Sequence, residues 1–168
     1  SYHYNDKEIE CLENVEAIQS TLTSLESIIV VPNGSRQDSH HLERAVSWES
    51  FLATAPELPL EFTPVDFNHP LYIMYSSGTT GAPKCIVHGT GGTLVQHLKE
   101  HKLHTDLSRD DTLFYFTTCG WMMWNWLVSG LATGCTLLLY DGSPFARSGR
   151  ILLDAIDAEG ITVFGTSA

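Results

Sequence analysis

An uncharged stretch in the second half of the chain constrains the fold most strongly. It runs from Thr112 to Tyr140 without Asp, Glu, Lys, Arg or His. An uncharged run of roughly 20 residues can span a bilayer, but glycines and one asparagine interrupt this one. Its ends, 113–116 and 136–140, are apolar and favour strands, whereas its middle has large apolar residues at helical spacing: Trp121, Trp124, Val128 and Leu131. The stretch therefore predicts a buried strand, helix and strand rather than a membrane span.

Apolar spacing elsewhere alternates between the helical and the strand period. The expected elements are a helix over 7–25, a strand over 28–31, a polar loop over 33–47, a short helix over 48–53, strands over 71–75 and 85–87, a helix to about 103, a strand over 113–117, a helix over 121–132, a strand over 135–140, a helix over 150–158 ended by Gly160, and a strand over 161–165. This order predicts an α/β fold with a mainly parallel sheet and flanking helices.

A proline-rich acidic connector over 56–70 divides the chain. It separates a helix and strand segment, 1–55, from an α/β core over 71–168. The sequence has no initiator Met and stops at Ala168, just after the last expected strand. A covering element normally follows such a strand, so we expect the chain to be a piece of a larger protein.

Charge and cysteine usage exclude several classes of protein. The chain has 9 Lys and Arg against 20 Asp and Glu, a net charge of −11. Without a basic stripe, a nucleic-acid partner is not expected. The cysteines, Cys11, Cys85, Cys119 and Cys135, form no CxxC pair, so we expect small buried hydrophobic residues in a reducing compartment rather than disulfides or a zinc cage. No signal peptide is visible, and a cytoplasmic location is expected.

A loop of small and hydroxyl residues carries the strongest functional signal. It reads Ser-Ser-Gly-Thr-Thr-Gly-Ala-Pro-Lys from Ser76 to Lys84. Glycine permits a positive φ and lets backbone amides approach oxyanions closely, and Lys84 adds a positive charge at the far end. These residues in this order suit a triphosphate or a pyrophosphate. The alternative is a surface turn that binds nothing.

The loop is not a Walker A loop. That motif opens directly into a helix after its Gly-Lys pair, whereas here Pro83 precedes Lys84 and the following residues favour a strand. We therefore expect a strand–loop–strand clamp for phosphate.

The segment from Tyr75 to Lys84 resembles the signature loop of adenylate-forming enzymes, which include acyl-CoA synthetases, luciferases and peptide-synthetase adenylation domains. The continuation to His101, with 120–126 and 139–144, is more similar to the acetoacetyl-CoA synthetase branch than to other branches. The family's later adenine, ribose, hinge and terminal lysine motifs do not occur here. The resemblance thus implies that 1–168 is part of the large N-terminal AMP-binding domain, without the C-terminal domain and inactive by itself.

The resemblance implies a reaction in two steps. A carboxylate attacks the α-phosphorus of Mg-ATP to give an acyl-adenylate and pyrophosphate, and the thiol of CoA then displaces AMP. ATP, Mg²⁺ and CoA are therefore the implied cofactor and co-substrates. The residues expected to bind the phosphates are Ser76, Ser77, Gly78, Thr79, Thr80, Gly81 and Lys84. Lys84 and Thr80 are the expected catalytic residues, with the Thr80 hydroxyl on the magnesium side.

The resemblance also implies an acyl and CoA pocket in the middle of the uncharged stretch. The residues expected there are Trp121, Met122, Met123, Trp124 and, with CoA, Phe145. Trp121 is the expected wall that limits acyl size. The alternative is a helix face of Trp and Met that only fills the core.

Other interpretations remain open at this point. His97, Glu100 and His101 match the H-x-x-E-H pattern of a zinc hydrolase. The chain could instead be a non-catalytic truncated product. Within the ligase interpretation, acetoacetate is the expected acid and acetate or propionate the alternative. Small molecules are the expected partners, and no metal-ligating residues are expected.

Overall fold

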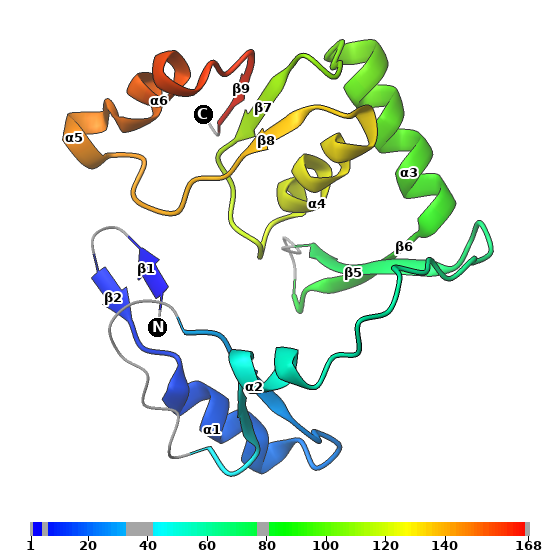
Figure 1. Cartoon of the computed structure of the whole chain (residues 1–168), viewed down its shortest axis with the longest axis vertical. Helices are drawn as coiled ribbons and strands as arrows, with labels where there is room; N and C mark the ends of the chain where they lie inside the picture. Colours follow the sequence, from blue (N-terminus) through cyan, green and yellow to red (C-terminus); the bar gives the residue numbers. More distant parts are fainter. Residues whose placement is uncertain (1, 5–6, 33–41, 77–80, 167–168) are drawn as a thin grey trace. The chain divides into compact units, whose positions relative to one another are not determined.

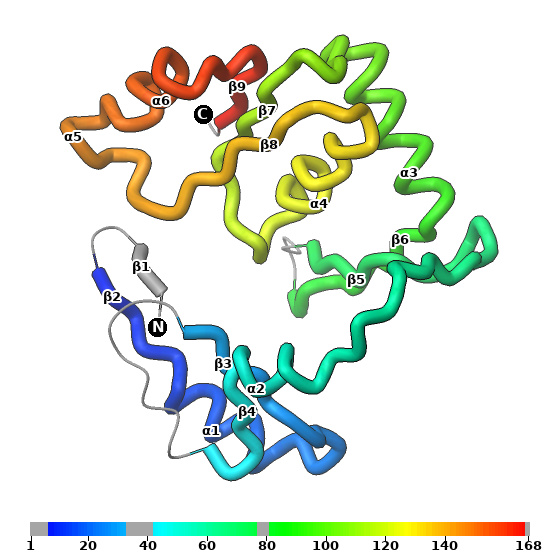
Figure 2. The backbone as a smooth tube through the Cα atoms, in the orientation of Figure 1, coloured from blue at the N-terminus to red at the C-terminus, as the bar shows by residue number. Residues whose placement is uncertain are grey.

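The computed structural model describes residues 2–4, 7–32, 42–76 and 81–166. The chain divides into two compact units, Ser1–Glu61 with Asp141–Ser143, and Phe62–Tyr140 with Pro144–Ala168. Figure 1 labels the helices and strands, and Figure 2 traces the backbone through both units. Each unit is described by itself.

The first unit combines a hairpin, two helices and a parallel strand pair. Its elements are β1 (Tyr2–Tyr4), β2 (Lys7–Ile9), α1 (Leu12–Thr21), β3 (Ile28–Val30), β4 (Ala45–Ser47) and α2 (Trp48–Ala53). β1 pairs antiparallel with β2, and β3 pairs parallel with β4. The Ser47 hydroxyl accepts a hydrogen bond from the Ser50 amide at 3.1 Å and so caps α2. The expected helix over 48–53 is confirmed.

Three expectations for this unit need correction. The helix expected over 7–25 begins only at Leu12, because 7–9 pair with β1 instead. The loop expected over 33–47 ends in a strand, β4, which forms by pairing with β3; 33–41 lie outside the described residues. The strand expected over 28–31 covers only Ile28–Val30, and its Ile29 is 41% exposed.

The second unit begins with an antiparallel pair on either side of the candidate loop. β5 (Pro70–Ser76) and β6 (Lys84–Gly89) pair so that Ser76 lies opposite Lys84. This confirms the strands predicted on both sides of the candidate loop, of which 77–80 lie outside the described residues. Within the connector expected over 56–70, residues 56–69 contain no helix or strand, as the prolines predict, whereas Pro70 already belongs to β5.

A three-stranded parallel sheet forms the centre of the second unit. β7 (Thr112–Tyr115) lies between β8 (Thr136–Leu138) and β9 (Val163–Gly165), and both neighbours run parallel to it. Successive side chains of a strand point to opposite faces, so Leu113 and Phe114 enter different clusters. The predicted mainly parallel sheet is thus confirmed for this part of the fold.

Helices cover both faces of this sheet (Figure 1). The helical elements are α3 (Thr90–Lys99), a π-helical turn η1 (Glu100–His104), α4 (Met122–Ser129), a 3₁₀ turn η2 (Gly130–Thr133), α5 (Ala146–Gly149) and α6 (Ile151–Glu159). One cluster packs Leu107, Leu113, Leu127 and Cys135, with Trp124 and Trp126 against it. The other packs Phe114, Leu152 and Ile161. Helices on two sides of a parallel sheet are the α/β layering that the sequence predicts.

The ends of the helices differ in detail from the expectation. The helix expected to reach 103 changes from α to π geometry at Glu100. The helix expected over 121–132 ends at Ser129 and continues as a 3₁₀ turn. The predicted stop at Gly160 is confirmed, because this residue adopts a left-handed conformation with φ of 62° that glycine tolerates best.

Two expectations about burial are also wrong. The helical stripe predicted inside the uncharged stretch is mostly on the surface: Trp121 is 69% exposed and Leu131 is 58% exposed, whereas Leu127 is buried. Of the four free cysteines, only Cys135 is buried.

Across the described ranges, no helix is both long and apolar enough to cross a membrane.

Candidate functional site

Three of the seven residues expected to bind phosphate lie within the described part of the chain. Ser76 ends β5 and is half-buried, and Lys84 opens β6 opposite it with an exposed side chain. Gly81 has φ of 156°, a backbone conformation that side chains with a Cβ rarely adopt. The other expected phosphate residues, Ser77, Gly78, Thr79 and Thr80, lie outside the described residues.

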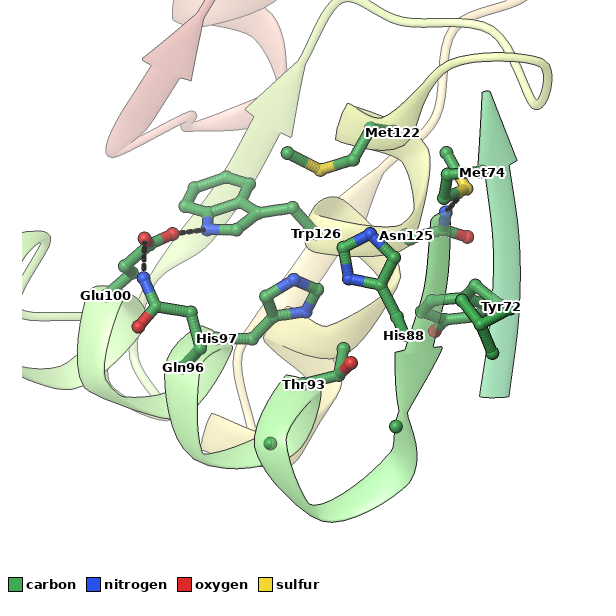
Figure 3. Close-up of a pocket in the computed structure, with 13 residues that line it drawn as sticks. Tyr72, Met74, His88, Thr93, Gln96, His97, Glu100, Met122, Asn125 and Trp126 are labelled. Carbon is green, nitrogen blue, oxygen red and sulfur yellow. Dashed lines mark hydrogen bonds between the residues drawn. The ribbon is translucent and has the colours of Figure 1, made fainter. Parts of the chain in front are cut away.

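A cavity of about 410 Å³ lies beside the pair β5–β6. Its other walls come from α3 with Glu100 at the start of η1 and from α4, as Figure 3 shows. α3 begins directly after β6, and both the amide and the hydroxyl of Thr90 donate to the His69 carbonyl at 2.8 Å. This junction brings the end of β6 and the first turns of α3 to one cavity wall. The labelled lining residues are Tyr72, Met74, His88, Thr93, Gln96, His97, Glu100, Met122, Asn125 and Trp126.

A hydrogen-bonded network fixes one side of the cavity. The Glu100 carboxylate accepts from the Trp126 indole Nε1 at 2.8 Å and from Gln96 Nε2 at 2.6 Å. Lys99 Nζ donates in turn to Gln96 Oε1 at 3.1 Å. The network ties α3 and η1 to α4, so the Trp126 ring is held in one place.

His101 secures the backbone of the same tryptophan. Its side chain is fully buried, and its Nε2 lies 3.0 Å from the Trp126 carbonyl and 2.9 Å from Ser129 Oγ. A carbonyl only accepts hydrogen bonds, so Nε2 carries a proton. Burial lowers the pKa of His101 below its ordinary value, and the bond to the Trp126 carbonyl opposes that shift only in part. His101 is therefore a neutral structural group at neutral pH.

Two polar groups that line the cavity have little or no hydrogen bonding within the protein. The Nδ1 atom of His97 is buried and has no hydrogen-bond partner among the described residues, and the same is true of His101 Nδ1, which does not line the cavity. The Asn125 amide donates at 3.4 Å to the Met74 sulfur, which is a weak acceptor. Burial lowers the pKa of His97, with an opposing effect from Glu100 and a smaller lowering from His88. The cavity thus presents a neutral imidazole and an amide next to apolar side chains.

The contacts of the H-x-x-E-H segment do not favour a zinc hydrolase. Glu100 is engaged by two donors, and the His101 Nε2 atom faces the Trp126 carbonyl. A zinc site needs unprotonated ring nitrogens and carboxylates that converge on one point. In the part of the chain that the structure describes, no group of three His, Cys, Asp or Glu residues converges in this way.

The residues predicted for the acyl and CoA pocket are dispersed. Met122 lines the cavity. Trp121 precedes the first turn of α4 and is mostly exposed, and Trp124 packs against the core. Met123 is half-buried and does not line the cavity, and Phe145 is 76% exposed before α5.

Several lining residues were not predicted as pocket residues, although the sequence contains a signal for some of them. Asn125 is a polar residue within an uncharged, largely apolar stretch. His97 and Glu100 stand out through their H-x-x-E-H spacing, but this spacing also matches a zinc hydrolase and does not by itself indicate a pocket wall. Trp126 carries no such signal, because its partner Glu100 lies 26 positions away in the sequence.

Comparison with known proteins gives consistent matches along almost the whole chain. The family model described as AMP-binding enzyme matches residues 3–167. Acetoacetyl-CoA synthetase from Gallus gallus is 51% identical over 98% of this chain and 26% of its own length. Malonamoyl-CoA synthetase from Penicillium aethiopicum is 46% identical over 98% of this chain and 25% of its own length.

A solved structure agrees with these sequence matches. Acetoacetyl-CoA synthetase from Streptomyces lividans matches with a TM-score of 0.85 and 42% identity, over 99% of this chain and 25% of that one. The chain thus spans about a quarter of the length of the relatives that it matches. Because the family model covers residues 3–167 and a relative is 51% identical over 98% of the chain, this chain belongs to the AMP-binding enzyme family.

Proposed function

We propose that the whole protein carrying this chain is an AMP-forming acid–thiol ligase that converts acetoacetate to acetoacetyl-CoA. The observation that carries the proposal is the 51% identity to an acetoacetyl-CoA synthetase over 98% of the chain. We propose further that 1–168 is part of its N-terminal AMP-binding domain, divided into 1–55, the connector 56–70 and the core 71–168. The C-terminal domain would lie outside this chain, which would be inactive alone.

The first step gives the acyl group a good leaving group, AMP, which a free carboxylate lacks. Attack of the carboxylate on the α-phosphorus of Mg-ATP forms a bond to the α-phosphate and breaks the bond to the β-phosphate, which releases pyrophosphate. Negative charge grows on that pyrophosphate as it departs, and preorganised donors and a cation stabilise it. We assign this role to Ser76, Ser77, Gly78, Thr79, Thr80, Gly81 and Lys84, with Thr80 and Lys84 as the catalytic residues. The position of Lys84 opposite Ser76 at the loop ends supports the assignment.

The names of the relatives suggest the chemical class of the acid. Acetoacetyl and malonamoyl groups both carry a carbonyl on carbon 3. We therefore propose a short 3-carbonyl acid as the substrate, with Met122 and the cavity beside β5–β6 as its acyl site.

The second step uses CoA as co-substrate. Its thiol attacks the acyl carbon of the adenylate, and the bond to AMP breaks. We keep Trp121, Met123, Trp124 and Phe145 as proposed residues of the acyl and CoA pocket, because two of them, Trp121 and Phe145, present exposed aromatic surface. A cytosolic site of action fits the four free cysteines.

The proposal is tested by the products that the whole protein forms. Purified protein is supplied with ATP, Mg²⁺, CoA and one acid from a panel of acetoacetate, acetate and propionate. We expect acetoacetyl-CoA and AMP in equal amounts, and much slower reaction with the other two acids. Preference for acetate or propionate would change the proposed substrate but keep the proposed class of enzyme. Absence of a thioester with every acid would favour a protein without catalytic activity.

A further inference from the structure

Side chains from two helices line the cavity in regular stripes. The lining residues of α4 are spaced i, i+3 and i+4, which places their side chains on one face of the helix: Met122, Asn125 and Trp126. The lining residues of α3 and the start of η1 have the same kind of spacing: Thr93, Gln96, His97 and Glu100. Figure 3 shows both stripes at the cavity. Each helix thus turns one face to the same cavity.

A hydrogen bond joins the two stripes. Trp126 Nε1 donates to one carboxylate oxygen of Glu100 at 2.8 Å, and Gln96 Nε2 donates to the other oxygen at 2.6 Å. Because both oxygens are engaged, the carboxylate has a defined position and fixes the direction of the indole. The helix changes to π geometry at Glu100, and π-helical turns often mark functional sites.

The Trp126 ring is also supported by the core. The ring centroid of His101 lies 4.3 Å from it and that of Tyr115 lies 6.0 Å from it, and Trp126 packs against a buried core cluster. The ring therefore has a firm backing while it lines the cavity, and Glu100 anchors its Nε1 edge. Met122 continues the wall one turn earlier on the same face, and apolar walls of this kind are typical of small-molecule sites.

We propose that Glu100 is a positioning residue for the acyl substrate, because it holds the Trp126 ring in the orientation in which the ring and Met122 contact the acyl carbons. The inference rests on the proposed function, which places the acyl group in this cavity. Glu100 acts through Trp126 rather than on the reacting atoms. A wall that is fixed before binding costs no ordering when the acid binds. Loss of the carboxylate therefore weakens binding of the acid and leaves the reacting groups unchanged.

The direct test is Glu100→Ala in the whole protein. We expect the KM for acetoacetate to rise by about 5-fold or more, while kcat and the KM for ATP stay within about 3-fold. A role in folding alone would lower the folded fraction, and with it the apparent kcat, but would leave every KM unchanged. An unchanged KM for acetoacetate in Glu100→Ala would overturn the inference.

Conservative variants separate the hydrogen bond from other effects of the substitution. Glu100→Gln keeps an oxygen that accepts from the indole, so its KM for acetoacetate should stay within about 2-fold of the unaltered value. Trp126→Phe keeps an apolar ring but lacks the donor, so adding Glu100→Ala to it should raise this KM no further. Independent effects of the two substitutions would contradict the inference. Glu159→Ala is the matched control, because it removes an exposed carboxylate from α6, away from the cavity.

Tryptophan fluorescence gives a readout that does not depend on turnover or on the Glu100 variants. With a non-hydrolysable ATP analogue bound, acetoacetate should change the fluorescence of the unaltered whole protein. The change should be smaller in Trp126→Phe and the same in Glu159→Ala. An equal change in Trp126→Phe would place the acid away from this ring and overturn the inference.

The outcomes distinguish this inference from the proposed function. If the whole protein activates no acid, the proposed function is wrong and the inference falls with it. If it activates acetoacetate and Glu100→Ala binds the acid as the unaltered protein does, the function stands and the positioning role of Glu100 is wrong.

Discussion

The indole Nε1 of Trp126 donates a hydrogen bond to the Glu100 carboxylate at 2.8 Å and thereby joins α4 to the π-helical turn that follows α3. The backbone carbonyl of Trp126 also faces His101 Nε2 at 3.0 Å. One tryptophan is thus held at both its ring and its main chain. π-helical turns are rare and often occur at functional sites, and this one places Glu100 and His101 where both can reach α4.

Removing the Glu100 carboxylate should loosen α4. A hydrogen bond to a charged group contributes about 1.5–3 kcal/mol, and Glu100 is only half-buried, so we expect Glu100→Ala to lower the local opening free energy of α4 by about 1–2 kcal/mol. Glu100→Gln keeps an acceptor and should lose less. Hydrogen exchange of the α4 amides in the whole protein measures both, and equal protection in all three proteins would contradict the role of Glu100.

Acidification should also destabilise α4, in this case through protonation of His101. Burial lowers the pKa of its imidazole, so the unfolded or opened state takes up a proton more readily than the folded state. This contribution to stability is present above the ordinary histidine pKa of about 6.5 and is lost as the pH falls below it. Protection of the α4 amides should therefore decrease between about pH 7 and pH 5.5.

The matched control for this pH effect is His101→Gln, which cannot titrate in that range. The variant should keep only the pH dependence that other groups contribute, such as His97, whose pKa is lowered as well. If the variant shows the full pH dependence, His101 is not its source.

Two glycines should respond in opposite ways to an added methyl group. A Cβ on Gly130 would lie 2.9 Å from Leu113 Cδ2 in the buried core, whereas a Cβ on Gly92 in α3 would meet nothing within 4 Å. Overpacking costs about 1–3 kcal/mol, and alanine is about 0.5–1 kcal/mol better than glycine within a helix. Gly130→Ala should lower the thermal midpoint of the whole protein and Gly92→Ala should not. A similar thermal midpoint for both variants would show that the core around Leu113 accommodates the added methyl group.

The ionised carboxylate of Asp111 should stabilise the edge of the central sheet. Its carboxylate accepts from the Ser108 hydroxyl at 2.8 Å, the Ser108 amide at 2.7 Å and the Thr162 hydroxyl at 2.8 Å. These bonds hold the pKa of Asp111 below its usual range, and the two from Ser108 have the largest effect. The resulting stability is present above the ordinary aspartate pKa of about 3.9 and is lost as the pH falls below it.

The corresponding experiment compares acid unfolding of the unaltered protein with that of Asp111→Asn. We expect the variant to be less stable at neutral pH and to lose less stability between about pH 5 and pH 3. Parallel acid-unfolding curves would show that the three hydrogen bonds do not favour the ionised carboxylate.

Local sequence signals predicted the elements that depend on local chemistry. The helix over 48–53, the stop at Gly160 and the two strands beside the candidate loop were expected from short apolar runs and from a glycine at the helix end. β4 was missed because Ala45–Ser47 becomes a strand only by pairing with the distant β3. β2 was read as helix for the same reason, since its partner β1 decides its conformation.

The cavity depends still more on long-range contacts. The sequence marks His97 and Glu100 by their spacing but leaves open whether they bind a metal or a neighbouring side chain. Only the meeting of α3, η1 and α4 pairs Glu100 with Trp126 and leaves the Nδ1 atom of His97 without a partner in the part of the chain that the structure describes. Asn125 is conspicuous in the sequence, yet its place beside Met74 follows from tertiary structure alone.

We propose that the loop ending at Lys84 stabilises pyrophosphate during adenylate formation, and isotope exchange measures this step by itself. The whole protein, given acetoacetate, Mg-ATP and labelled pyrophosphate without CoA, should move label into ATP. Lys84→Ala should reduce the exchange by about 100-fold or more, as expected for losing a cation that stabilises a transition state, while Lys7→Ala in β2 should leave it unchanged. Exchange in Lys84→Ala at the rate of the unaltered protein would contradict the claim.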